Sequence, residues 1–391
     1  MAIADIIHIF ATAKNFRQQV KLIVKTLYGA ESLLSKELEQ LGATNISEQR
    51  RAVSCDVPDY RTLYKINLWS RFALRVLMPV VEIVATNDKE LYEAVHSYQW
   101  HKIITPDRTI MLDHISFSTI FPDSQFLAMR AKDAIVDEIR EQLGARPYVD
   151  TENPDILLNI HATDDKITIS LDASGTPLNR RGYRQSMTQY ATNEVLAATL
   201  VELSGWQPDM TLVDPMCGTG TICIEAAMKA RNIAPNMFRK EPFGFMNWND
   251  FDIETWREIK KEAQEMQKNV RLRILGSDID TDSLDIAKLS TLEIGLNNDI
   301  RIQRKGVREL ERTTEDGMII TVPPYVQEEG RRNIEDLYKE VTFFMSRKLP
   351  DYDAWIYSTN LKALMAIEYR SEKKYQLYNG SQEGNFNMYP F

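Results

Sequence analysis

Short apolar runs alternate with segments whose apolar residues recur at helical spacing along the second half of the chain. The apolar runs that read as strands are Thr211–Asp214, Arg273–Asp280, Asp299–Arg304, Met318–Val322 and Ala354–Ser358. The helical segments between them are Thr221–Ala230, Thr281–Gly295 and Asn333–Arg347. Such alternation predicts a parallel sheet wrapped by helices.

The last part of the chain has a different pattern. Two runs of alternating polarity, Lys374–Tyr378 and Ser381–Tyr389, flank Asn379-Gly380. Asn-Gly between two such runs is the strongest short-range signal of a β-hairpin. We therefore expect the parallel sheet to end in an antiparallel hairpin.

The first half of the chain mixes helices and strands without this regular order. The expected helices are Tyr28–Leu41, Arg61–Asn67 and Gln125–Leu143, and the expected strands are Leu74–Val84, Thr109–Phe117, Ile156–Ala162 and Lys166–Asp172. This pattern predicts one or two small α+β domains. A polar segment, Ser174–Thr192, connects them to the second half.

Composition places the chain among soluble globular proteins. Its 391 residues are enough for two or three domains, and 43% hydrophobic with 26% charged residues is ordinary for such proteins. The net charge of −9 gives no general attraction to a phosphate backbone. If the protein binds nucleic acid, it must do so through a local basic face.

Cysteine and histidine positions argue against disulfides and metal sites. Three cysteines make no disulfide framework, and the five histidines show no metal-ligand spacing. The first twenty residues lack the basic start of a signal peptide, and no apolar stretch reaches membrane-spanning length. We expect a cytoplasmic protein with no metal and no membrane partner; the sequence leaves the oligomeric state open.

The most specific motif is the segment Val213–Thr221, Val-Asp-Pro-Met-Cys-Gly-Thr-Gly-Thr, which joins an expected strand to an expected helix. Closely spaced glycines let the backbone approach a ligand, and the helix N-terminus directs N–H groups toward it. The segment therefore predicts a nucleotide-binding turn. The alternative is a tight turn that binds nothing.

With its flanks, this segment resembles the S-adenosylmethionine (SAM) loop of class I methyltransferases. Separate segments resemble one family, bacterial RNA methyltransferases that methylate guanine N2 of 23S ribosomal RNA. They are a THUMP-like helix in Phe117–Ile135, the linker Leu171–Arg184, the helix start Asn193–Ala198 and an insertion running from Asn232 to Trp248. The resemblance covers about residues 22–391.

The resemblance implies a Rossmann-like class I methyltransferase domain with a C-terminal antiparallel hairpin, preceded by α+β ferredoxin-like and THUMP domains. The expected boundaries are an N-terminal extension (1–20), a ferredoxin-like segment (21–75), a THUMP RNA-binding domain (76–172), a linker (173–190) and a SAM-dependent methyltransferase domain (191–391). SAM is the implied cofactor and RNA, specifically 23S ribosomal RNA, the implied partner.

The cofactor-binding residues that the resemblance implies lie in the loop and around it: Glu194, Asp214, Pro215, Cys217, Gly218, Thr219, Gly220, Asp278 and Glu309. Asp214 would face the amino group or sulfonium of SAM, and its alternative role is to cap the following helix. Asp278, at a strand end, would accept the ribose hydroxyls; we expect Asp280 and Asp282 to be helix-cap and first-turn charges. Glu309 would contact the adenine, or lie free on the surface.

The fourth strand carries the expected catalytic residues Val322, Pro323, Pro324 and Tyr325. Members of the resembled family usually read Asn-Pro-Pro-Tyr here, where the Asn side chain and the following Pro carbonyl accept hydrogen bonds from the target amine. Tyr325 can stack on an extruded base, and the Pro323 carbonyl can accept a bond, but Val322 cannot. The family's Gly-Glu-Arg after the Tyr is also replaced, by 326–330.

Five basic residues are candidates for RNA contact: Arg130, Lys132, Arg180, Arg181 and Arg184. The first two lie on the THUMP-like helix. The other three flank Tyr183 in the linker, where arginines beside an aromatic ring suit phosphate contact and base stacking. A solvated hinge is the alternative for the linker.

The leading hypothesis is a SAM-dependent RNA methyltransferase that acts on an exocyclic base amine, guanine N2 of 23S ribosomal RNA. One alternative is an RNA- and SAM-binding module whose catalysis is impaired by Val322. The other is an adenine-N6 methyltransferase, because it uses the same strand-four chemistry.

Overall fold

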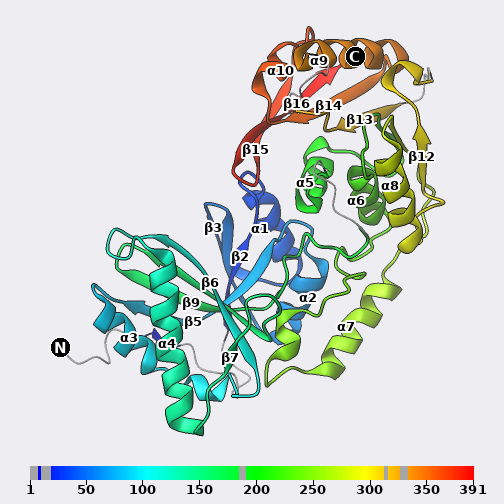
Figure 1. Ribbon diagram of the computed structural model, residues 1–391. Helices are drawn as coiled ribbons and strands as arrows, with labels where there is room; N and C mark the ends of the chain where they lie inside the picture. Colours follow the sequence, from blue (N-terminus) through cyan, green and yellow to red (C-terminus); the bar gives the residue numbers. More distant parts are fainter. Residues whose placement is uncertain (1–7, 10–18, 185–190, 312–315, 326–332) are drawn as a thin grey trace.

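The computed structural model describes residues 8–9, 19–184, 191–311, 316–325 and 333–391. These residues form two halves, each built on its own sheet (Figure 1). Most of the expected N-terminal extension, the linker residues 185–190 and the segment 326–330 lie outside the described residues.

The first sheet has nine strands, in the order β3-β4-β2-β5-β9-β8-β6-β7, and β1 pairs with β5. The strands are β1 (His8–Ile9), β2 (Val20–Lys25), β3 (Thr44–Gln49), β4 (Ala52–Val57), β5 (Arg75–Val84), β6 (Thr109–Phe117), β7 (Tyr148–Val149), β8 (Ile156–Thr163) and β9 (Lys166–Asp172). Strand β5 pairs with β2 and with β9, so one continuous sheet joins residues of the ferredoxin-like and THUMP segments.

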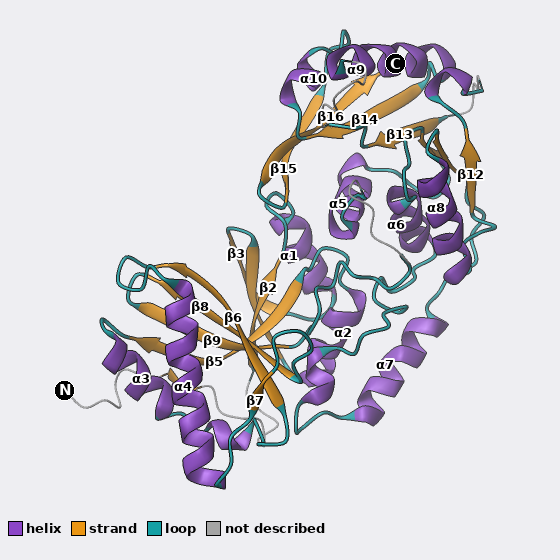
Figure 2. Ribbon diagram, viewed as in Figure 1, coloured by secondary structure: helices purple, strands orange, loops and turns teal. Residues whose placement is uncertain are grey.

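Helices α1 (Glu31–Gln40), α2 (Tyr60–Trp69), α3 (Asp88–His96) and α4 (Ser124–Leu143) cover this sheet (Figure 2). Their ends follow from local chemistry. The carboxylate of Asp59 accepts a hydrogen bond from the Thr62 N–H at the start of α2, and Asp123 caps α4 in the same way. Gly144 ends α4 with a φ of 76°, a left-handed conformation that favours glycine.

The second sheet has seven strands, in the order β12-β11-β10-β13-β14-β16-β15. They are β10 (Thr211–Asp214), β11 (Ile274–Asp278), β12 (Ile300–Arg304), β13 (Gly317–Thr321), β14 (Tyr352–Ser358), β15 (Lys373–Asn379) and β16 (Gln382–Pro390). The first five strands are parallel, and β16 runs antiparallel to both of its neighbours. The predicted fold class, a Rossmann-like sheet ending in an antiparallel hairpin, is confirmed.

Helices pack on both faces of this sheet. The helices are α5 (Glu194–Ser204), α6 (Thr221–Ala230), α8 (Thr281–Glu293), α9 (Ile334–Lys348) and α10 (Leu361–Met365). Neighbouring residues of β13 show the alternation: Ile320 packs with α5 and α6, whereas Ile319 packs with α9. The carboxyl ends of the parallel strands therefore meet at one edge, where ligands bind in such folds.

The insertion after α6 belongs to the core of the first half. Its residues Phe243 and Phe245, together with Trp256 of the following helix α7 (Ile253–Glu265), are buried in the same apolar cluster as the first sheet. The rings of Tyr64 on α2 and Phe245 stack with their centroids 4.3 Å apart. The methyltransferase half thus supplies part of the core of the other half, and α7 lies beside α2 in Figure 1.

The linker is packed rather than free over its described residues, 173–184. The Ala173 N–H donates to the Val76 carbonyl at 2.9 Å, and the Leu178 N–H donates to the Leu74 carbonyl at 2.9 Å. Arg239 of the insertion donates to the carbonyls of Ser174, Thr176 and Pro177. The hinge expected as an alternative is wrong for this part of the linker.

The hairpin of β15 and β16 makes another contact between the halves. Gly380 adopts a φ of 61° in the turn, which confirms the predicted Asn-Gly hairpin. At its tip the rings of Tyr28 and Tyr378 meet edge to face with centroids 4.9 Å apart, and the Tyr378 N–H donates to the Tyr28 carbonyl at 3.3 Å. Figure 1 shows β15 reaching toward α1.

No helix within the described residues is long and apolar enough to cross a membrane. Nor do histidine, cysteine and acidic side chains gather there in threes or more at a position suited to a metal ion.

Candidate active site

The glycine-rich loop lies at the carboxyl edge of the second sheet, between β10 and α6. Gly218 and Gly220 have φ values of 50° and 76°, a region that L side chains rarely adopt. The Cys217 N–H donates to the Ser277 carbonyl at 2.9 Å, which holds the loop against β11. A Cβ added at Gly218 would meet nothing within 4 Å, so the backbone there is open to a ligand.

Asp214, the last residue of β10, is buried under this loop. Its Oδ1 accepts a hydrogen bond from the Thr321 hydroxyl at 2.8 Å and from the Met216 N–H at 3.3 Å. Burial raises the pKa of Asp214 to about 7. The alternative that Asp214 caps α6 is wrong, because the residue at that cap is Gly220.

Asp278 ends the neighbouring strand, β11, and its carboxylate is joined to the loop. Its Oδ2 accepts from the Gly218 N–H at 2.9 Å, and its Oδ1 accepts from the Asp280 N–H at 3.0 Å. Asp280 caps α8 through the Ser283 N–H, and Asp282 is an acidic residue of its first turn, so both helix roles are confirmed. Asp278 therefore shapes the loop from the next strand, and its contact with a ribose stays a prediction.

Glu309 lies on the surface after β12. Its Oε2 accepts a hydrogen bond from the Gly306 N–H at 2.8 Å, so the side chain folds back on its own loop. The arrangement accounts for Glu309 without a ligand. Its contact with an adenine stays a prediction.

The segment Val322–Tyr325 follows β13 at the same edge, and two residues that sequence reasoning missed fix its backbone. The Tyr338 hydroxyl donates to the Pro323 carbonyl at 3.4 Å and lies 2.8 Å from the Ser358 hydroxyl, with which it shares a second hydrogen bond. The Asn360 side chain donates to the Tyr325 carbonyl at 3.3 Å. Asn360 follows the carboxyl end of β14, and a polar residue at that position was the available signal.

Two of the predicted RNA-contacting arginines lie inside the protein. The side chain of Arg181 is fully buried, and that of Arg184 is 6% exposed. The prediction that they contact RNA is wrong, because both guanidinium groups are used by internal carbonyl and carboxylate oxygens. Tyr183 is also buried, with its hydroxyl 3.1 Å from Glu225, so it cannot stack on a base. Arg180 is exposed, and its RNA contact stays a prediction.

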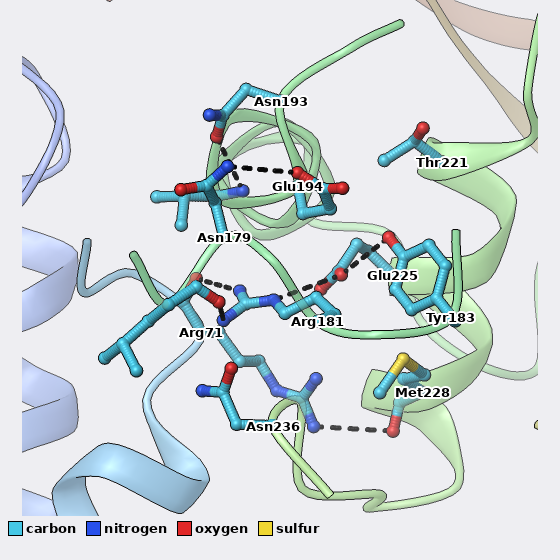
Figure 3. Close-up of polar contacts among 12 residues, drawn as sticks. Arg71, Asn179, Arg181, Tyr183, Asn193, Glu194, Thr221, Glu225, Met228 and Asn236 are labelled. Carbon is cyan, nitrogen blue, oxygen red and sulfur yellow. Dashed lines mark hydrogen bonds and ion pairs between the residues drawn. The ribbon is translucent and has the colours of Figure 1, made fainter. Parts of the chain in front are cut away.

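Arg181 and Arg71 hold the two halves together, and sequence reasoning missed Arg71 (Figure 3). Arg181 donates to the Ser70 carbonyl at 3.2 Å and the Leu178 carbonyl at 2.9 Å, and its Nε lies 3.5 Å from Glu225 on α6. Arg71 donates to the Ile233 carbonyl at 2.8 Å and the Met228 carbonyl at 3.4 Å. Both guanidinium groups therefore bridge the first half and the α6 region.

Glu194, the first residue of α5, is also buried, and it pairs with Arg184 at 3.2 Å. Burial raises the pKa of this carboxyl, while the neighbouring Arg184 opposes the rise. Its predicted contact with the cofactor stays a prediction.

The THUMP residues Arg130 and Lys132 are engaged locally. The Arg130 guanidinium lies 4.2 Å from the centre of the Tyr92 ring, and Lys132 pairs with Asp133 at 2.8 Å. Both side chains are partly exposed, and their contact with RNA stays a prediction.

Three family models match the chain in succession. Residues 21–77 match an RlmL ferredoxin-like domain, residues 85–172 a THUMP domain, and residues 181–387 an RMKL-like methyltransferase domain.

Relatives of known name support the same grouping. A Synechocystis protein named as an RNA methyltransferase, slr0064, is 31% identical over 354 residues, which is 90% of this chain and 92% of that protein. A ribosomal RNA large subunit methyltransferase K/L of Methylococcus capsulatus is 35% identical over 91% of this chain. The chain spans about half the length of that K/L protein, 49%.

Solved structures share the fold. SMU.472, described as a methyltransferase and solved with SAH, is similar with a TM-score of 0.84 and 26% identity, over 96% of this chain and 98% of that one. A methylase structure from Clostridium difficile 630 is similar with a TM-score of 0.84 and 30% identity, over 95% of this chain and 98% of that one.

Proposed function

Since the chain belongs to the methyltransferase family that joins RlmL ferredoxin-like, THUMP and RMKL-like methyltransferase domains, we propose that it transfers a methyl group from SAM to an exocyclic amine of an RNA base. The specific target that we propose is guanine N2 of 23S ribosomal RNA. The K/L relatives are named as methyltransferases of large-subunit ribosomal RNA, and the chain covers about half of their length.

One observation carries the proposal. The hydrogen bond between Thr321 and Asp214 joins the end of β13 to the end of β10, at 2.8 Å between oxygens. The segment Val322–Tyr325 follows Thr321 and the glycine-rich loop follows Asp214, so both segments leave adjacent strands at the same edge of the sheet. A methyl donor held by that loop and a base held by Tyr325 would therefore meet at one edge of the sheet, and holding both reactants in place is most of the work of this reaction.

The residues around the loop fit SAM. The cofactor carries a cationic amino group and sulfonium, and when bound it supplies an electrophilic methyl group. Asp214 and Asp278 are two carboxylates on adjacent strand ends, and the backbone at Gly218 between them has open space above it. Asp214 would face the cationic part of the cofactor, and Asp278 has lone pairs left to accept ribose hydroxyls.

At the target, Tyr325 would stack on the extruded base and the Pro323 carbonyl would accept a hydrogen bond from its amine. That carbonyl already accepts a long bond from Tyr338, and an oxygen with two lone pairs can accept a second. Arg180, Arg130 and Lys132 would contact RNA phosphates from the outside of the two halves.

The assay that tests this function uses purified full-length protein, tritiated SAM and ribosomal RNA that lacks the modification. Mass spectrometry of the digested RNA identifies the methylated nucleoside. N2-methylguanosine in the large-subunit RNA is the expected product. Incorporation of tritium no higher than with a Gly218→Asp variant would reject the function. N6-methyladenosine as the product would show that the target base is adenine instead of guanine.

Val322 supports one alternative function, a SAM- and RNA-binding protein with impaired catalysis. An apolar side chain cannot accept a bond from the target amine, and losing such a positioning contact costs on the order of a hundredfold in rate. We expect Val322→Asn to raise the methylation rate by about that factor with unchanged SAM affinity. Activity seen only in Val322→Asn would favour the alternative, and equal activity in both proteins would show that Val322 is no impairment.

Asp278→Ala should weaken SAM binding by about 1.5–3 kcal/mol, the range for hydrogen bonds to a charged group. The variant removes the proposed ribose contact and frees the Gly218 N–H at the same time. Calorimetry with SAM measures the change. Asp280→Ala is the matched control, because it removes a helix cap two residues away and should lower the melting temperature while leaving SAM affinity unchanged.

The affinity for SAM should rise with pH around neutrality. The pKa of Asp214 in the folded protein is about 7, so its charged form, which attracts the cationic cofactor, gains population from about pH 6 to about pH 8.

The same shift in the pKa of Asp214 makes the free energy of unfolding fall as the pH rises from about 4 to about 7, because the folded state holds this proton more tightly than the unfolded state. Measurements of the SAM affinity and of the free energy of unfolding at several pH values test this prediction. Asp214→Asn should remove most of the pH dependence of both quantities.

A further inference from the structure

Three arginines hold helix α6 at its start, its middle and its end. Arg184 donates to the hydroxyl of Thr221, the first residue of α6, at 2.7 Å. Arg181 lies against Glu225 in the middle of the helix. Arg71 donates to carbonyls at its end. None of the three comes from α6 or the loop before it. Figure 3 shows the contacts of Arg181 with Glu225 and of Arg71 with Met228.

Arg184 is the one that reaches the cofactor loop. Besides Thr221, it donates to the Thr192 carbonyl at 2.9 Å, and its Nη1 lies 3.2 Å from the Glu194 carboxylate. The Thr221 hydroxyl in turn lies 3.3 Å from that of Thr219, inside the loop. A single buried guanidinium thus ties the start of α6 to the start of α5 and reaches the glycine-rich loop through two hydroxyls.

The same linker continues into the first half of the protein. It follows β9 directly, and Arg181, three residues before Arg184, donates to carbonyls of the first half. The start of α6 therefore receives a contact from outside the methyltransferase sheet. The loop before it is also held within that half, because Cys217 and Gly218 are bonded to β11 and Gly220 lies against Ala287 of α8. Arg184 adds the contact to Thr221 from the side of the linker.

We propose that Arg184 is a positioning residue for the cofactor, which joins Thr221 at the start of α6 to Glu194 at the start of α5 and so helps to fix the loop that binds SAM. The proposal rests on the proposed function, because it requires SAM at this loop. It replaces the predicted RNA contact of Arg184 with an internal role. A guanidinium suits that role because its rigid fork can serve a hydroxyl, a carbonyl and a carboxylate at once.

The experiment compares full-length wild type with Arg184→Ala, Arg184→Lys and Thr221→Val. SAM dissociation constants come from calorimetry, RNA dissociation constants from a fluorescence titration, and melting temperatures from calorimetric scans. Thr221→Val is the informative variant, because it deletes one hydroxyl and keeps both the side-chain shape and the pair of Arg184 with Glu194. Arg257→Ala, which removes an exposed Arg–Glu pair on α7, is the matched control.

We expect Thr221→Val to raise the SAM dissociation constant roughly ten-fold and Arg184→Ala roughly ten- to hundred-fold, in line with a hydrogen bond to a charged group. RNA affinity should stay unchanged in both. The double variant should bind SAM only slightly worse than Arg184→Ala, because the bond between Arg184 and Thr221 is already lost there and only the contact of Thr221 with Thr219 is removed in addition. Arg184→Lys keeps the charge beside Glu194 but not the forked guanidinium. Its SAM dissociation constant should therefore lie between those of wild type and Arg184→Ala. The control should match wild type.

Two results would overturn the proposal. Unchanged SAM affinity in Arg184→Ala and Thr221→Val would show that the loop does not depend on this contact. Parallel losses of SAM affinity, RNA affinity and melting temperature in Thr221→Val would reduce the contact to ordinary core packing. Wild-type protein that binds no SAM would overturn the cofactor assignment as well, and that outcome is recognised before any variant is compared.

Discussion

Tyr325→Ala is expected to abolish methylation while SAM binding survives. Stacking of a base on an aromatic ring is worth about 1–3 kcal/mol, and an amine that is no longer held in line with the methyl group loses on the order of a further hundredfold in rate. Tyr325 is partly exposed at the edge of the sheet that also carries the glycine-rich loop, and its carbonyl accepts a hydrogen bond from Asn360. The variant tests whether its ring stacks on a substrate base.

Tyr325→Phe is the matched variant, since stacking needs the ring and not the hydroxyl, and it should keep most of the activity. The melting temperature and the SAM dissociation constant are measured on the same preparations. Lost activity with both quantities unchanged supports the target-base role. A parallel fall in activity, stability and SAM affinity in Tyr325→Ala would instead make Tyr325 a packing residue.

Arg181→Ala should lower the free energy of unfolding by about 3–5 kcal/mol, the usual cost of removing one partner of a buried ion pair. The change deletes donors to the Ser70, Leu178 and Arg71 carbonyls and leaves Glu225 buried without its cation. Urea denaturation measures the loss. Because Arg181 bridges the two halves, we also expect their unfolding to separate into two transitions.

A double variant distinguishes lost charge pairing from lost packing. Arg181→Met with Glu225→Leu replaces the pair by apolar side chains and should recover much of the stability, because neither charge is then stranded. Arg257→Ala, at an exposed ion pair, should change stability little. A loss in Arg181→Ala no larger than in this control would mean that the buried arginine adds nothing to the contact between the halves.

The strands of the second sheet and helices α6, α8 and α9 could be predicted from sequence because their signals are local, whereas α7 and α10 were missed. Apolar runs of strand length, helical spacing and the Asn379-Gly380 turn each act within a few residues. The glycine-rich loop was recognisable for the same reason, since Gly218 and Gly220 are required by backbone conformation. In the first half β3 was missed, because its exposed residues give no alternation, and β2 was missed although it contains the buried Leu22 and Val24. Strand β4 and helix α3 were missed as well.

The environment of the linker arginines could not be predicted in that way. An arginine beside a tyrosine has the same sequence signature on a surface as in a core, and only contacts distant along the chain decide between them. Arg181 is buried by Arg71 and Glu225, which lie 110 residues before it and 44 residues after it by their sequence numbers. The roles of Asn360 and Tyr338 likewise depend on strands meeting at one edge of the sheet.

The aromatic insertion has a consequence for the order of events during synthesis. Domains usually fold in turn as they leave the ribosome, the N-terminal one first. Here the ring of Tyr64 packs against Phe245 and Trp256, which are translated only after β10 and α6. The core around Tyr64 is therefore incomplete until those residues have been synthesised. We therefore expect the nascent first half to expose apolar surface until α7 emerges, and to complete its folding together with the methyltransferase half.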